Sequence, residues 1–296
     1  MLTSLDHIII GVHDLASAAS IFQRDLGLLP SGGGVHPLGG TANRIIVIGD
    51  TYLELIAMDR PEEAQESLRQ RLARGEGYLN FVLSSNNIRA DIRAMHQRNV
   101  AVIGPTPGEL RSSDGRSRAW VRADVEQVAL TQRYPFIIQH DSVGEERRLR
   151  LAGWTTPPVH PLGAIKVLSV TLAVENLDEA SRRFSHIYGL QPSVPYSSAP
   201  GDLDAQVVSF TLDQSGQTFE LAVPVRGDNG PDTLRDHLKR FGESVCRMTL
   251  LVNSLAQART YLSEHNVPYA DVSSERPFLW INPRYTCAAS IVLQEK

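Results

Sequence analysis

Apolar runs of strand length alternate along the chain with segments of helical spacing. One run covers residues 5–12 and another covers 52–56, and each contains one polar side chain of a metal-ligand type, His7 and Glu54. Side chains of a strand alternate between its two faces. If the two strands are neighbours, the imidazole and the carboxylate converge on one side of the sheet.

The residues between these runs have the spacing of an amphipathic helix. Apolar positions recur every three or four residues across 15–26, Asp14 is a suitable N-cap, and Gly27 stands where a helix would end. The segment that follows contains the glycine groups 32–34 and 39–40. We expect these glycines to form a mobile loop that could close over a ligand.

The same unit recurs in the second half of the chain. With a shift of 162 residues and no gap, 12–31 aligns with 174–193, and eight of the 20 positions are identical. Shorter units with a strand, a helix and a second strand begin near residues 80 and 247. Repetition of this kind predicts four modules in two domains.

Composition is typical of a globular protein and excludes several functional classes. The 296 residues, 42% hydrophobic and 21% charged, suffice for two domains. The formal charge of -4 gives no basic surplus, so we expect no nucleic-acid partner. No apolar run reaches the length of a membrane span and no signal peptide is recognisable, so we expect a cytoplasmic protein without a membrane partner. Cys246 and Cys287 have no partner motif, and we interpret both as structural.

The segments 35–43 and 48–56 together resemble the signature of the glyoxalase-like domain family, within the vicinal oxygen chelate superfamily. That superfamily includes glyoxalases, extradiol dioxygenases and bleomycin-sequestering proteins. The resemblance implies an α+β fold with four βαβββ modules, paired into two glyoxalase-like open-barrel domains. We place these domains at 1–140 and 164–296, joined by a proline-rich linker at 141–163. It also implies a possible homodimer.

In this superfamily the first and last strands of paired modules hold a metal. Carried over to the first module, the resemblance gives His7 and Glu54 as ligands, with Glu54 also the candidate catalytic base. In the second module it places Asn80 opposite His7 and Gln139 opposite Glu54. Amide oxygens are weak ligands, so the set is incomplete for a divalent metal such as Mg, Mn, Zn, Ni or Fe. Alternatively, His7 and Glu54 only hydrogen-bond each other in a buried pocket.

Paired modules of this superfamily form an open cup around the metal position. Further residues around this cup in domain one are candidates for binding a small molecule. An arginine would select a carboxylate or a similar anion, and an indole would supply an apolar wall. Arg118 has the same potential as Arg116, although both are also compatible with a solvated surface. The candidate substrate-binding residues are His36, Thr41, Asn43, Asn80, Arg116 and Trp120.

The second domain departs further from the ligand pattern. Ser169 and Arg247 occupy the positions equivalent to His7, whereas Glu220 is a carboxylate at the position equivalent to Glu54. We therefore predict that an ion pair between Arg247 and Glu220 takes the place of a metal. Domain two is then a scaffold or a second binding surface.

Two functions from different classes remain open. The first is a divalent-metal-dependent lyase or isomerase of the glyoxalase type, acting on a small oxygen-bearing molecule in the domain-one cup. The second is a metal-free protein that binds a small molecule or drug, as bleomycin-resistance proteins do. An extradiol dioxygenase is less favoured, because the second domain lacks the expected triad of two histidines and one carboxylate.

Overall fold

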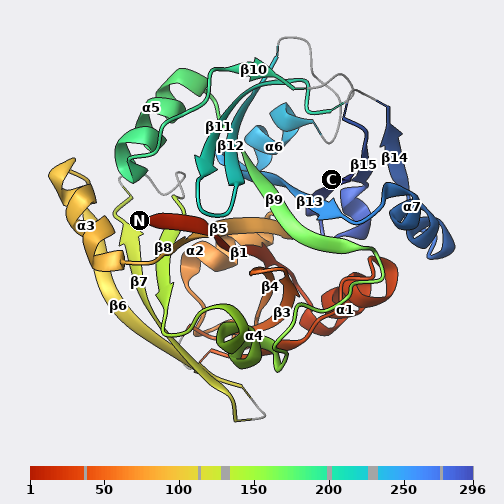
Figure 1. Ribbon diagram of the computed structural model, residues 1–296, viewed down its shortest axis with the longest axis horizontal. Coiled ribbons are helices and arrows are strands. Elements are labelled where there is room, and N and C mark those ends of the chain that lie inside the picture. The colour runs from red at the N-terminus through yellow and green to blue at the C-terminus, as the bar shows by residue number, and fades with distance from the viewer. Residues whose placement is uncertain are drawn as a thin grey trace.

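The computed structural model describes residues 1–36, 39–112, 115–127, 134–198, 202–225, 233–273 and 276–295. Within these ranges the chain forms two eight-stranded mixed sheets, one for each half of the sequence (Figure 1). The first sheet contains β1 (Leu2–Gly11), β2 (Gly32–Val35), β3 (Thr41–Ile48), β4 (Thr51–Met58), β5 (Gly77–Ser85), β6 (Val102–Arg111), β7 (Ser117–Val125) and β8 (Phe136–His140). The second contains β9 (Ala164–Ala173), β10 (Tyr196–Ser197), β11 (Ala205–Leu212), β12 (Gln217–Pro224), β13 (Ser244–Val252), β14 (Tyr269–Val272), β15 (Phe278–Ile281) and β16 (Ser290–Glu295).

The two sheets have the same strand order, which confirms the predicted module architecture. The order is β2-β3-β4-β1-β5-β8-β7-β6 in the first sheet and β10-β11-β12-β9-β13-β16-β15-β14 in the second. In each module the first strand pairs in parallel with the last one, and the two first strands pair antiparallel at the centre of the sheet. The fold is therefore α+β, with two modules in each of two domains.

A helix follows the first strand of each module, as the sequence predicts. Asp14 caps the first helix by accepting from the Ser17 amide at 2.6 Å, and Gly27 follows its last turn with a φ of 57°. None of the helices in the described ranges combines the length and the apolar character needed to cross a bilayer. The helices are α1 (Leu15–Ser20), the π-helix η1 (Ile21–Asp25), α2 (Glu66–Ala73), α3 (Ile88–Gln97), α4 (Gly144–Ala152), α5 (Leu177–Tyr188), α6 (Leu234–Phe241), α7 (Leu255–Glu264) and the 3₁₀ turn η2 (Pro283–Tyr285).

Two segments differ from the expectation. The glycines at 32–34 belong to strand β2, which pairs with β3, so they do not form a loop. The predicted linker contains α4, which contacts β2, β3 and β7 (Figure 1). Leu151 and Ala152 of this helix pack on Ile45, Val47 and Tyr52. The helix therefore covers the concave face of the first sheet. Burial of these apolar side chains against one another removes them from water, which stabilises this arrangement.

The two domains share one apolar core. Phe81 of β5 and Phe219 of β12 lie with their ring centroids 5.6 Å apart, and Phe210 stacks on Phe219 at 4.7 Å. Strands β5 and β13 are also in contact. Aromatic contacts of this kind add to the free energy that burial itself contributes. The domains are therefore packed as one body.

Gln217 of β12 joins the two domains through its buried amide. Its Oε1 accepts from the Leu5 backbone N–H at 3.0 Å. Its Nε2 donates to Thr51 Oγ1 and to the Val167 carbonyl, both at 2.9 Å. One side chain of domain two therefore satisfies the backbone of strand β1 of domain one.

Replacing Gln217 with alanine is expected to lower the free energy of unfolding by about 2 kcal/mol, because a buried N–H loses its acceptor. Denaturant titration followed by circular dichroism measures this loss. Gln206→Ala is the matched control, because the Gln206 amide donates to Ser197 Oγ in an exposed position. Equal stability of the two variants would contradict the assigned role of Gln217.

Candidate functional site

His7 and Glu54 meet on the concave face of the first sheet, which we call the domain-one cup. Strand register places His7 beside Tyr52 and Ile9 beside Glu54. His7 Nε2 lies 3.6 Å from Glu54 Oε2, and both residues are buried. The Tyr52 ring stacks on the imidazole with centroids 4.5 Å apart. The alternation of strand side chains thus brings together the two side chains that it predicts.

Asp6 also lies in this cup, although simple alternation would turn it away from His7. An irregularity in the β1–β5 register between Leu5 and His7 allows both neighbours to face the same side. Asp6 is fully buried, with Oδ1 2.7 Å from His7 Nδ1. The same oxygen lies 3.3 Å from His140 Nε2, and Oδ2 accepts from Arg147 Nη2 at 2.8 Å. Asp6 is the central site residue that the sequence pattern does not reveal.

The charge of Asp6 is stabilised by its partners. Burial alone would raise its pKa, but Arg147, His140 and His7 together hold the pKa of this carboxyl well below its usual range. An ionised carboxylate can only accept hydrogen bonds, so His7 Nδ1 carries the proton of that contact. In the neutral ring, Nε2 is then the acceptor, and it faces Glu54. Asp6 therefore fixes both the tautomer and the orientation of His7.

A second network holds Glu54 from the side of β2 and β3. Asn43 Nδ2 donates to Glu54 Oε1 at 2.5 Å, and His36 Nε2 lies 3.7 Å from the same oxygen. His36 Nδ1 is within 2.8 Å of Thr41 Oγ1, and Asn43 Oδ1 accepts from the Gly34 amide at 3.0 Å. The structure thus brings three of the predicted substrate-binding residues together around the carboxylate, and each occupies a hydrogen-bonded position.

The expected position of Gln139 opposite Glu54 is wrong. Gln139 Oε1 accepts from the backbone N–H of Ile88 at 2.8 Å and so caps α3, on the opposite face of the sheet. Its neighbour His140 faces the cup instead, and burial lowers the pKa of that imidazole. The strand register explains the error. Ile9 pairs with Glu54 in the first module, and the equivalent Val82 pairs with Phe136 in the second, so a phenyl ring occupies the place of the carboxylate.

The other predicted binding residues are dispersed. Asn80 Nδ2 donates to the Tyr134 carbonyl at 3.1 Å, and its Oδ1 accepts from the next backbone amide. Arg116 donates to the Leu149 carbonyl of α4 at 3.0 Å, so it supports the covering helix. Trp120 does line the cup, where it packs against the apolar cluster formed by Val82, Phe136 and Ile138.

The donor set of the cup does not fit a divalent metal. Asn43 directs its N–H toward Glu54, the amide of Asn80 is bonded elsewhere, and Phe136 offers no ligand atom. Across the described part of the chain, no three side chains of His, Cys, Asp or Glu are grouped so that they could hold a metal ion. The chemistry derived below therefore uses only the side chains of the protein.

The equivalent cup of domain two has a different charge arrangement. Arg247 forms its ion pair with Asp202, which precedes β11, so the predicted pairing with Glu220 is wrong. Glu220 Oε2 instead accepts from Thr171 Oγ1 at 2.6 Å, and burial raises the pKa of this carboxyl. The aspartate lies outside the strands, where strand alternation could not predict it.

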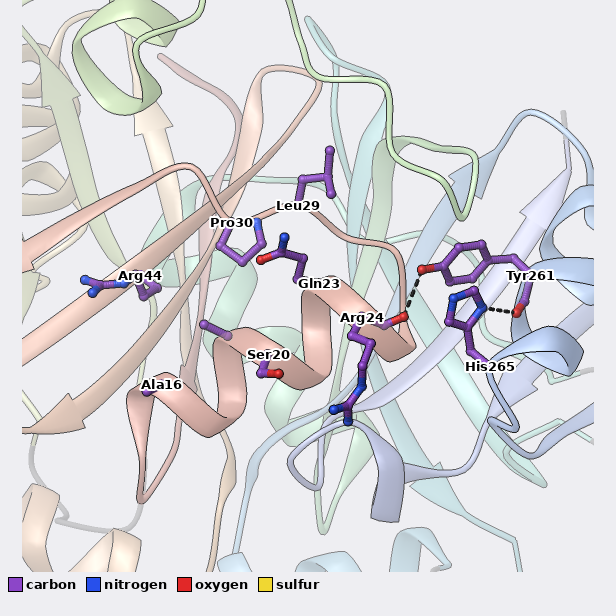
Figure 2. A pocket seen from close by; sticks show the side chains of 10 residues that line it. Ala16, Ser20, Gln23, Arg24, Leu29, Pro30, Arg44, Tyr261 and His265 are labelled. Carbon is purple, nitrogen blue, oxygen red and sulfur yellow. Dashed lines mark hydrogen bonds between the residues drawn. The ribbon is translucent and has the colours of Figure 1, made fainter.

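A separate hollow of about 700 Å³ lies on the outer surface, where α1 and η1 approach α7 (Figure 2). Tyr261 donates to the Arg24 carbonyl at 2.9 Å, and His265 Nδ1 lies 2.8 Å from the Tyr261 carbonyl. Arg44 lines the hollow, whereas its neighbour Asn43 faces the cup. None of the predicted site residues lines this hollow, so it is distinct from the cup.

Comparisons with known proteins agree with the fold. Among solved structures, a hypothetical protein from Staphylococcus aureus has a TM-score of 0.69 and 14% identity, with 100% of both chains covered. A mutant of 4-hydroxymandelate synthase from Streptomyces coelicolor has a TM-score of 0.66 and 12% identity, covering 99% of this chain and 92% of its own. No curated protein matches the sequence. The model of the glyoxalase-like domain matches residues 5–188, which is more than half of the chain. The chain therefore belongs to the glyoxalase-like domain family of the vicinal oxygen chelate superfamily.

Proposed function

We propose that the domain-one cup binds a small oxygen-bearing organic molecule and that His7 and Glu54 move a proton on it, as in a lyase or isomerase. The observation that carries this proposal is the chain of contacts from Asp6 through His7 to Glu54. Asp6 fixes His7 so that Nε2 faces Glu54 Oε2 across 3.6 Å. With a neutral imidazole and an ionised carboxylate both of these atoms are acceptors, and the distance exceeds that of a hydrogen bond. A substrate O–H or an acidic C–H would supply the missing proton between them.

The surrounding residues support this chemistry. In the proposed reaction one of the two acceptors removes a proton from the carbon next to a carbonyl group, and the same group then returns a proton to a neighbouring atom, so that the protein ends in its starting state. Asp6 would stabilise the imidazolium when His7 takes the proton. Asn43 would hold Glu54 in place through its 2.5 Å hydrogen bond. Helix α4 packs on Ile45, Val47 and Tyr52 beside the site, which would restrict the access of water to the reacting groups.

A metal-free binding protein is the second candidate function. The apolar wall formed by Trp120, Phe136 and Ile138 favours it, because aromatic and aliphatic surface contributes affinity without any reaction. The two candidates differ in one measurable property. Only the enzyme exchanges substrate protons with solvent.

Glu54→Gln is expected to slow proton exchange at least about 100-fold, because general acid–base groups contribute rate factors of that order. The assay follows deuterium incorporation from D₂O into pyruvate, 2-oxobutyrate and hydroxyacetone by proton NMR. Glu220→Gln is the matched control, since Glu220 occupies the equivalent strand position in domain two. Binding of these compounds without exchange in the unmodified protein would favour the binding protein instead.

Asp6→Asn tests whether this carboxylate remains ionised in the folded protein. Because folding depresses the pKa of Asp6, its contribution to stability is complete above its ordinary pKa of about 4 and is lost as pH falls through the folded-state pKa. The variant should be less stable at pH 7, and its unfolding free energy should change less than that of the unmodified protein below about pH 4.

The measurement is urea unfolding between pH 2 and pH 7, an interval chosen to bracket the ordinary carboxyl pKa of about 4. Asp50→Asn is the control, because the Asp50 side chain is 80% exposed although it pairs with Arg148. If Asp6→Asn and the unmodified protein lost stability in parallel on acidification, the ionised state of Asp6 would be refuted.

A further inference from the structure

Arg118 of β7 is a buried cation that lacks a hydrogen-bond partner at one of its nitrogens. The residue is 5% exposed, and no described residue accepts a hydrogen bond from its Nη1, which is shielded from solvent. The Nε atoms of Arg147, Arg183 and Arg247 also lack an acceptor among the described residues, but the charge of each is compensated by an ion pair, with Asp6, Glu243 and Asp202 respectively. A buried N–H of a charged group without an acceptor is costly, so the arrangement requires an explanation.

The position of Arg118 places it in the domain-one cup. Alternation along β7 puts it on the same face as Trp120, which packs against Phe136 in the cup. Its charge also acts on Tyr52. Burial raises the pKa of that phenol, Asp6 and Glu54 raise it further, and Arg118 opposes them. Arg118 therefore faces the His7–Glu54 pair from the side of the second module.

We infer that Arg118 binds the carboxylate of the ligand, so that the substrates of the cup are small carboxylic acids with an oxygen on the neighbouring carbon. This inference rests on the proposed function of the same cup. The planar guanidinium group has N–H donors in the geometry that matches the two oxygens of a carboxylate. The unpaired Nη1 supplies the donor that such a group needs.

The charges of the cup agree with this orientation. Glu54 and Asp6 repel an anion, whereas Arg147 already has Asp6 as its partner. A carboxylate is therefore directed to Arg118, and the carbon chain extends toward His7 and Glu54. A 2-oxo or 2-hydroxy acid bound in this way presents its polar carbon to the proton-transfer pair, and Trp120 contacts its apolar end.

Calorimetric titration of the full chain with pyruvate and with pyruvamide tests the inference. These probes have the same size and differ in charge. We expect pyruvate to bind the unmodified protein more tightly than pyruvamide. Arg118→Met should weaken pyruvate binding at least tenfold and leave pyruvamide binding unchanged, and Arg118→Lys should restore part of the affinity. Arg259→Met is the control, because Arg259 lies in domain two and pairs with Asp271.

The melting temperature without ligand separates this role from a structural one. Arg118→Met should melt at the same temperature as the unmodified protein or higher, since it removes an unpaired buried donor, whereas loss of a structural arginine would lower it. The inference is overturned if the unmodified protein does not bind pyruvate, if it prefers pyruvamide, or if Arg118→Met binds pyruvate as well as before. Pyruvate binding that depends on Arg118 without proton exchange would refute the proposed function and leave the inference standing. Proton exchange whose KM is unchanged in Arg118→Met would refute the inference and leave the proposed function standing.

Discussion

The buried carboxylate of Asp6 is the interaction on which the domain-one cup depends. A carboxylate removed from water is unfavourable unless several donors surround it, and here the donors come from three different parts of the chain. His7 lies on β1, His140 on β8 of the second module, and Arg147 on the covering helix α4. The same charge therefore orients the candidate base, connects the two modules across the cup and fixes the helix that closes it.

The two domains have one topology but differ in the state of their polar groups. In domain two the charges have partners within the cup, since Arg247 pairs with Asp202 and Glu220 accepts from Thr171. In domain one His7 Nε2 faces Glu54 Oε2 beyond hydrogen-bond distance, and the guanidinium of Arg118 forms no ion pair with a described residue. Within the described ranges, buried guanidinium nitrogens without an acceptor occur in both domains, on Arg118 and Arg147 in the first and on Arg183 and Arg247 in the second. The cups therefore differ in the ion pairs of these side chains, and the uncompensated charge of Arg118 supports the proposed ligand site in domain one.

Local patterns predicted much of this structure because they report on local constraints. The module order followed from the repeat, and the meeting of His7 with Glu54 followed from alternation along two strands. Gln139 was misplaced because strand register in the second module is set by non-local pairing, which puts Phe136 in the position of Glu54. Asp6 was missed because an irregular β1 register breaks the alternation. The burial of Arg118 could not be read from sequence at all, since it depends on every strand around the cup.

The Gln217 amide makes the strand alignment of domain one depend on domain two. It bonds to the backbone of Leu5 and to Thr51, which lie immediately before the strand segments that carry His7 and Tyr52. The half without the candidate chemistry thus serves as an internal template that sets the spacing of the strands in the other half. Phe81 also packs on Phe219 of that half. An isolated first domain would therefore expose an apolar surface and at the same time lose the hydrogen bonds that align its strands. The polar residues of the second cup can therefore change without loss of this alignment, whereas the side chains at the contact between the two halves have to stay complementary.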